Sequence, residues 1–246
     1  MMLCLLAWAA GIVDAVSYLG LGRVFTAMMT GNTVLLALAI GQGESMAVLR
    51  SALALAGFSV GAATGALIVS RGRSRDEWPP SVTAAFAVEA VLLAGFTAVW
   101  HVAGSTLTTG TTNLLIVLSG LAMGVQAAAV RHLGIPGVAT TYLTGTLTSL
   151  MAELVGWGRA LAGASLRAAS SAERAIDASA SLKWPQRIGL LTGIFFVYAL
   201  GALVGGALHA RSSTLVAWLP FAAVVVVVVN GVMRHRHAGH GSRGGS

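Results

Sequence analysis

Charged residues are scarce in this sequence. Only 9% of its 246 residues are Asp, Glu, Lys or Arg, whereas 56% are hydrophobic. An average soluble domain is roughly one quarter charged, and it needs that charge to cover its surface. The composition therefore excludes an ordinary soluble enzyme and a disordered chain, and it indicates a protein embedded in a membrane.

Cysteine and lysine are each present only once. Because Cys4 is the only cysteine, the chain has no intrachain disulfide and no cysteine-based metal site. The net charge of +7 comes from Arg residues that stand alone or in short clusters between apolar runs. This pattern is typical of loop charges that orient a membrane protein. We therefore expect the basic side chains to face lipid headgroups and not nucleic acid.

Familiar catalytic and nucleotide-binding motifs are also missing. The sequence contains neither a P-loop nor an HExxH zinc motif. His235, His237 and His240 have loose metal-ligand spacing, but they stand in a tail of Gly, Ser, Arg and His that we expect to be disordered. The sequence accordingly predicts no metal, no cofactor and no enzymatic activity.

Long apolar runs dominate what is present. Eight runs approach the roughly 20 residues that cross a bilayer as a helix: Met2–Leu21, Val24–Ile40, Met46–Ser70, Ser81–His101, Asn113–Leu133, Val138–Trp157, Arg187–Ala210 and Thr214–Met233. The second run is the weakest because Thr, Gly and Asn interrupt it. The first lacks the basic residues that precede the core of a signal peptide, so we interpret it as a membrane helix. The predicted fold is all-α, a polytopic membrane helix bundle of about eight transmembrane helices.

An internal repeat organises these runs. The block from Val24 to Thr33 matches the block from Val138 to Leu147 at an offset of 114 residues, and Gly61–Gly65 matches Gly201–Gly205 at an offset of 140. We therefore predict two four-helix repeats, residues 1–104 and 105–233, with a linker at 158–185 inserted into the second and a disordered tail at 234–246. An even number of helices in each half makes the repeats parallel.

The distribution of Lys and Arg predicts the orientation. For eight crossings, a cytoplasmic N-terminus places nine of these residues inside and six outside. Cytoplasmic loops carry the excess of basic residues, so we expect both termini in the cytoplasm. The cluster of Arg71, Arg73 and Arg75 falls outside in this scheme and argues against it.

Two motifs give a family resemblance. The first comprises Gly11-Ile12-Val13-Asp14-Ala15, Phe25 to Met29 and Thr30-Gly31-Asn32-Thr33; the second comprises Ala122 to Ala127 and Thr140 to Thr146. Over nearly its whole length the chain resembles the YoaK-like (DUF1275) family of bacterial membrane proteins. The resemblance implies a multi-pass protein of the bacterial inner membrane. It implies no substrate.

Polar residues inside the apolar runs are the candidates for a solute site. Asp14 lies in the first run, with Ser17 and Tyr18 on the same helical face. A carboxylate at this depth must be paired, protonated or hydrated. It is therefore either a proton or cation site or a carboxylate bonded to Tyr18, Arg23 or a neighbouring backbone group.

The matching Thr-Gly blocks complete the candidate site. In transporters, interrupted segments at corresponding places of two repeats point to the substrate site, whereas the alternative here is helix packing without a ligand. The predicted substrate-binding residues are Asp14, Tyr18, Thr30, Gly31, Asn32, Thr33, Gln126, Thr140, Thr144, Gly145 and Thr146.

Glu89 is the most deeply placed acid of the sequence. It stands near the middle of the fourth run, and no polar residue adjoins it. We predict that Asp14 and Glu89 are proton-coupling residues. The alternative for Glu89 is a protonated acid that is hydrogen-bonded across a helix interface.

Glycines recur at four-residue spacing. Gly57, Gly61 and Gly65 form one row, for which the expected role is close helix packing. The same stretch matches the G-x-S-x-G pattern, and Ser59 with His209 resembles the dyad of rhomboid proteases. A nucleophile elbow requires a strand, a turn and a helix, whereas this motif lies inside a helix.

These features favour a small-solute transporter or permease that is driven by a proton or ion gradient. A non-transporting membrane scaffold or assembly factor is the alternative, and an intramembrane serine hydrolase is the third. The expected partners are membrane lipids and a small solute. Assembly into a homo-oligomer stays open.

Overall fold

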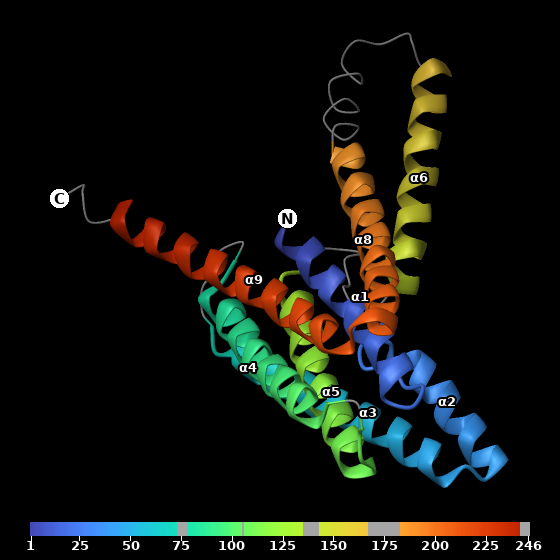
Figure 1. Cartoon of the computed structure of the whole chain (residues 1–246). Helices are drawn as coiled ribbons and strands as arrows, with labels where there is room; N and C mark the ends of the chain where they lie inside the picture. The colour runs from blue at the N-terminus through green and yellow to red at the C-terminus, as the bar shows by residue number, and fades with distance from the viewer. Residues whose placement is uncertain (73–77, 105, 135–142, 167–182, 242–246) are drawn as a thin grey trace.

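The computed structural model describes residues 1–72, 78–104, 106–134, 143–166 and 183–241, and every regular element in that part of the chain is a helix (Figure 1). The helices are α1 (Met2–Gly20), α2 (Met29–Gln42), α3 (Ser45–Ser70), α4 (Pro80–Ala103), α5 (Thr109–His132), α6 (Leu143–Leu166), α8 (Lys183–Arg211) and α9 (Ser213–Gly241). The predicted all-α fold is confirmed.

Two segments outside the predicted crossings, the tail that was expected to be disordered and the inserted linker, are partly helical. Helix α9 continues to Gly241, so the predicted tail from residue 234 is helical over most of its length. His235 explains part of this, because its Nε2 lies 3.2 Å from Oγ1 of Thr83 on α4. Helix α6 likewise reaches Leu166, inside the predicted linker, through a stretch rich in the helix formers Ala and Leu.

In the part of the chain that the structure describes, six of the helices are long and apolar enough to cross a membrane. They are α1, α3, α4 and α5, together with Ile188–Arg211 of α8 and Leu215–Arg236 of α9. The predicted polytopic bundle is thereby confirmed, but eight crossings were expected. Helix α2 has only 14 residues; at 1.5 Å per residue it is about 21 Å long, short of a hydrocarbon core of about 30 Å. Helix α6 is less apolar because it carries Glu153 and Arg159.

Helices α3 and α5 form the most extensive helix contact. A Cβ atom built on Gly65 would lie 2.9 Å from the carbonyl oxygen of Val125, and one on Gly61 would overlap the carbonyl of Leu121. The predicted close packing of both glycines is confirmed. From Gly61 to Gly65 along α3, the facing residue on α5 changes from Leu121 to Val125. The residue numbers increase together, so α3 and α5 run in the same direction.

Helices α1 and α8 cross in the same manner. Gly201 faces the carbonyl of Trp8, and Gly205 faces Ile12. These two helices are therefore also parallel. In each crossing the third helix of one predicted half packs against the first helix of the other half, so the halves interlock.

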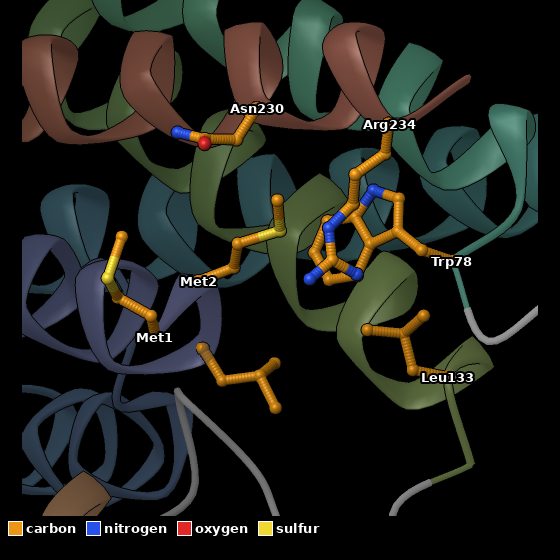
Figure 2. A pocket seen from close by; sticks show the side chains of 7 residues that line it. Met1, Met2, Trp78, Leu133, Asn230 and Arg234 are labelled. Atoms are coloured by element: carbon orange, nitrogen blue, oxygen red, sulfur yellow. The ribbon is translucent and has the colours of Figure 1, made fainter. Parts of the chain in front are cut away.

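One end of the bundle brings the N-terminus close to the later part of α9. Met1, Trp78, Leu133 and Arg234 line a single cavity of about 480 Å³, which Figure 2 shows. The starts of α1 and α4 therefore lie beside the end of α5 and beside Asn230 and Arg234 of α9. We call this the terminal end.

The opposite end is defined by a second group of residues, and we call it the far end. Gly20, the last residue of α1, faces the ring of Trp100 on α4 and the ring of His209 on α8. The centroids of these two rings are 6.1 Å apart. The ends of α1, α4 and α8 therefore meet here, and α1 crosses from the terminal end to the far end.

The directions of α1 and α5 bear on whether the two predicted repeats are parallel or inverted. Helix α1 runs from the terminal end to the far end, whereas its counterpart α5 ends at the terminal end with Leu133. Among the described residues, three of the six candidate crossings lie in residues 1–104 and the other three begin in residues 105–233. When each repeat has an odd number of crossings, the second repeat enters the membrane from the opposite side to the first. The pseudo-two-fold axis that relates the repeats would then lie in the membrane plane. The expectation of parallel repeats is therefore wrong, and the boundaries of the halves stay a prediction.

Candidate functional site

Asp14 lies at the centre of a buried hydrogen-bonded cluster and is only 3% exposed. Its Oδ1 accepts the backbone N–H groups of Thr26 at 2.9 Å and Ala27 at 2.7 Å. Its Oδ2 accepts the hydroxyl of Tyr198 at 2.5 Å. The two N–H groups precede the N-terminus of α2, where the helix dipole favours a negative charge. Asp14 therefore joins α1, the turn before α2, and α8.

Asn32 holds the same turn from α2. Its Oδ1 accepts the N–H of Phe25 at 2.9 Å, and its Nδ2 donates to the carbonyl of Phe25. The Ser17 hydroxyl donates to the carbonyl of Val13 at 2.7 Å and lies 3.0 Å from Oγ1 of Thr26. These polar groups have partners within the protein. The cluster therefore fixes the break between α1 and α2.

The backbone of the turn explains why it needs these side chains. Gly22 has φ +85° and Arg23 has φ +63°, so both residues are in the left-handed region and α1 cannot continue. The N–H groups that follow have lost their helical acceptors, and a buried N–H requires another. The side chains of Asp14 and Asn32 supply these acceptors.

The other predicted residues of the first half surround the cluster. Tyr18 is 38% exposed, and its ring stacks on Phe25 with centroids 5.0 Å apart. Thr30 and Thr33 are exposed, and the Thr33 hydroxyl donates to the carbonyl of Met29. A Cβ atom on Gly31 would lie 3.1 Å from the Phe25 ring. Asp14 and Asn32 are thus brought together, whereas Tyr18, Thr30 and Thr33 lie at the surface.

The predicted residues of the second half are more dispersed. Gln126 is fully buried, and its Nε2 donates to the carbonyl of Leu6 at 3.3 Å, so it meets α1. Helix α6, which packs along α8, carries Thr144, Gly145 and Thr146. Of these, Thr146 is fully buried, whereas Thr144 is exposed and no atom lies within 4 Å of a Cβ built on Gly145. Thr140 lies outside the described residues.

Glu89 is fully buried in α4 and differs from Asp14 in its surroundings. Neither carboxyl oxygen has a hydrogen-bond partner among the residues that the structure describes. Phe86 and Leu93, one turn away on each side, are buried apolar residues. The environment therefore offers this acid no compensation for the loss of water.

The catalytic alternative finds no geometric support in the surroundings of its two residues. The Ser59 hydroxyl is exposed and donates to the carbonyl of Leu55 at 2.8 Å, within its own helix. His209 instead packs against Trp100. In the described part of the chain, no group of three His, Cys, Asp or Glu residues is placed to hold a metal ion.

Tyr198 is a member of the cluster that the sequence patterns did not single out. It lies 184 residues from Asp14, and no local spacing connects the two. The available signal was chemical, because a phenol inside an apolar helix requires a hydrogen-bond partner. Of the partners predicted for Asp14, the neighbouring backbone is the one observed, rather than Tyr18 or Arg23.

The fold and the buried polar residues define a polytopic helical membrane protein. The chain belongs to the family described as "Protein of unknown function (DUF1275)", whose model matches residues 2–230. It is 43% identical over 155 residues to the "UPF0700 transmembrane protein YoaK" of Bacillus subtilis (strain 168), and the match covers 63% of this chain and 67% of that protein. The predicted resemblance is confirmed. No solved structure matches the chain.

Proposed function

We propose that this chain is a small-solute transporter. The observation that carries the proposal is the opposite direction of α1 and α5, each followed by a helix that is not among the long apolar crossings. In transporters built from inverted repeats, interrupted segments at corresponding positions mark the solute path. Helices α2 and α6 occupy such positions, and the first carries Asn32 while the second carries Thr146.

Glu89 is the acid to which we assign proton coupling. Asp14 already has three hydrogen-bond donors, whereas the carboxyl of Glu89 has none among the described residues. An acid in such a place changes its charge only when water or a cation reaches it. That property links protonation to a change in hydration, which a proton-driven cycle requires.

The test is uptake into proteoliposomes with and without a proton gradient, using a panel of small solutes. Glu89→Gln keeps the size of the side chain, so we expect the protein to fold and the gradient-dependent part of uptake to disappear. Glu153→Gln on α6 is the matched control and should retain it. Gradient-dependent uptake that survives in Glu89→Gln would remove the assignment.

A non-transporting scaffold is the second candidate function. Its favouring observation is that Asp14 and Asn32 are shielded from solvent and bonded to protein groups. A scaffold would show no uptake of any solute while remaining folded, and it would need a protein partner from the same membrane.

We place the protein in the bacterial cytoplasmic membrane with both termini inside. Counted along the sequence, a chain with six crossings carries twelve of its fifteen Lys and Arg residues on the terminal side, and only Arg23, Arg50 and Arg211 on the other. This bias of Lys and Arg is much stronger than the ratio of nine to six that eight crossings would give, and it favours a cytoplasmic terminal end. The Arg71 cluster then lies inside and no longer opposes the orientation.

A further inference from the structure

A cavity of about 740 Å³ lies at the far end, between the turn after α1, helix α2 and the start of α3. We call it the far-end cavity. Helices α2 and α3 pack side by side there, extending beyond the end of α1 (Figure 1). Its volume falls within the range of small-molecule sites, about 300 to 1,000 Å³.

Two arginines line the far-end cavity. Arg50 of α3 lies across Gly22, because a Cβ atom built on that glycine would be 2.8 Å from the guanidinium carbon. The φ of +85° at Gly22 disfavours any side chain there, so the turn leaves room for the guanidinium. Arg23, the next residue, also lines the cavity from its left-handed backbone position.

The charge of these arginines is not neutralised within the described residues. Arg50 Nε is shielded from solvent and lacks a hydrogen-bond partner there, and neither arginine forms an ion pair with a described carboxylate. Glu44 is the single acid among the residues that line the cavity. Two cations against one acid give the cavity an excess of positive charge.

The far-end cavity also has apolar walls and a hydroxyl group. Leu35 and Leu38 of α2 line the cavity, and the buried Ser51 adds a hydroxyl from α3. A planar guanidinium matches a carboxylate or phosphate, with which it forms two parallel hydrogen bonds. Leucine side chains match an apolar body attached to that group.

We propose that the far-end cavity binds a small organic anion, with a carboxylate or phosphate on Arg50 and Arg23 and an apolar body against Leu35 and Leu38. This inference rests on the proposed transport function and names its solute class. The cavity adjoins the turn that Asp14 and Asn32 fix, so a bound anion contacts the break between α1 and α2. In the orientation favoured by the charge bias, the anion enters from outside the cell.

Direct binding to the purified full-length protein tests the proposal. The probes are benzoate, phenyl phosphate and the uncharged benzamide, and the readouts are calorimetry and the thermal midpoint in a neutral detergent. We expect saturable binding of at least one anion at millimolar concentration and at least tenfold weaker binding of benzamide. Arg50→Gln should weaken anion binding at least tenfold. Arg50→Lys, which keeps the positive charge, should weaken it less.

The matched control is Arg71→Gln, which removes the same charge from the terminal end and should leave binding unchanged. Arg23→Gln provides a second variant at an exposed position if Arg50→Gln folds poorly. Equal binding by wild type and both cavity variants, equal binding of benzamide and benzoate, or no saturable binding of either anion would overturn the proposal.

Two further arms separate the sources of the anion and the two proposals. Nanodiscs of phosphatidylglycerol should leave probe binding as it is in phosphatidylcholine; if they abolish it in wild type, the anion is a lipid headgroup and the solute assignment fails. Binding without uptake in proteoliposomes would remove transport and retain the anion site. Uptake that is insensitive to both Arg50→Gln and Arg23→Gln would remove the anion site and retain transport.

Discussion

At the scale of single residues, the two buried acids have opposite surroundings. Asp14 accepts hydrogen bonds from three donors on α8 and the turn before α2, whereas the buried carboxyl of Glu89 has no hydrogen-bond partner among the described residues. A satisfied buried carboxylate stabilises one arrangement of the chain. An unsatisfied one favours any change that brings water or a cation to it. We therefore assign a structural role to Asp14, which fixes the turn before α2, and propose the proton-coupling role for Glu89.

The bond from Tyr198 to Asp14 yields a prediction about stability. Tyr198→Phe removes the hydroxyl and leaves Oδ2 without that donor, which should cost about 1–3 kcal/mol. Tyr18→Phe is the control, because the exposed Tyr18 hydroxyl is not part of the cluster. Thermal melting in detergent should show a lower midpoint for the first variant alone. Equal midpoints would mean that the cluster does not need α8.

Sequence reasoning located both acids and a backbone partner for Asp14, but it did not identify the distant side chain that bonds to Asp14. Asp14, Glu89 and Asn32 stand out because polar groups in apolar runs are costly. Tyr198 and Arg50 do not stand out, because their roles depend on which distant segments the fold brings together. Arg50 meets Gly22 only after α2 has turned the chain back.

At the scale of helices, glycine determines which elements approach closely. The α3–α5 and α1–α8 crossings both place glycine against a backbone carbonyl of the partner helix. Such contacts allow the backbones to pack where lipid provides no hydrophobic drive. The spacing of the glycines made this packing predictable, although it did not identify the partner helix.

Gly61→Leu should disrupt the α3–α5 crossing, because even its Cβ would overlap the carbonyl of Leu121. Overpacking of this kind costs about 1–3 kcal/mol or more. The control is Ala66→Leu, an exposed position on the same helix. The folded yield after detergent extraction should fall for Gly61→Leu and stay near wild type for Ala66→Leu. If both variants are tolerated, the crossing is not required for folding.

The number of crossings could not be read from hydropathy alone. The run Val24–Ile40 looked like a membrane helix, but its first five residues form the turn that Asp14 and Asn32 hold, and α2 begins only at Met29. Whether a short apolar run crosses depends on those long-range hydrogen bonds. In the sequence, the poor fit of the Arg71 cluster to eight crossings is the feature that favours six.

At the scale of the whole molecule, six crossings and eight crossings predict different sides for the same loops. With six crossings and the proposed orientation, Gly43 would lie outside the cell, whereas Gly72 and the C-terminus would lie in the cytoplasm. Reporter domains fused at the three positions distinguish these arrangements. A reporter that is active only in the cytoplasm should work at Gly72 and at the C-terminus, and it should fail at Gly43. Activity at Gly43 and at the C-terminus together with failure at Gly72 would restore eight crossings, whereas failure at both Gly72 and the C-terminus would reverse the orientation of six.

The interlocked halves also constrain how the chain is made. Helix α1 leaves the ribosome before the helices that follow it, yet the carbonyl that faces its Gly11 belongs to Tyr198, whose synthesis follows about 190 residues later. At about 5–20 residues per second, that interval lasts roughly 10–40 s. Throughout that interval, Gly11 of α1 lacks the α8 backbone against which it packs in the finished fold. The order of membrane insertion therefore cannot be the order of assembly, and a nascent chain that stops after α4 leaves the glycine faces of both α1 and α3 without their partners.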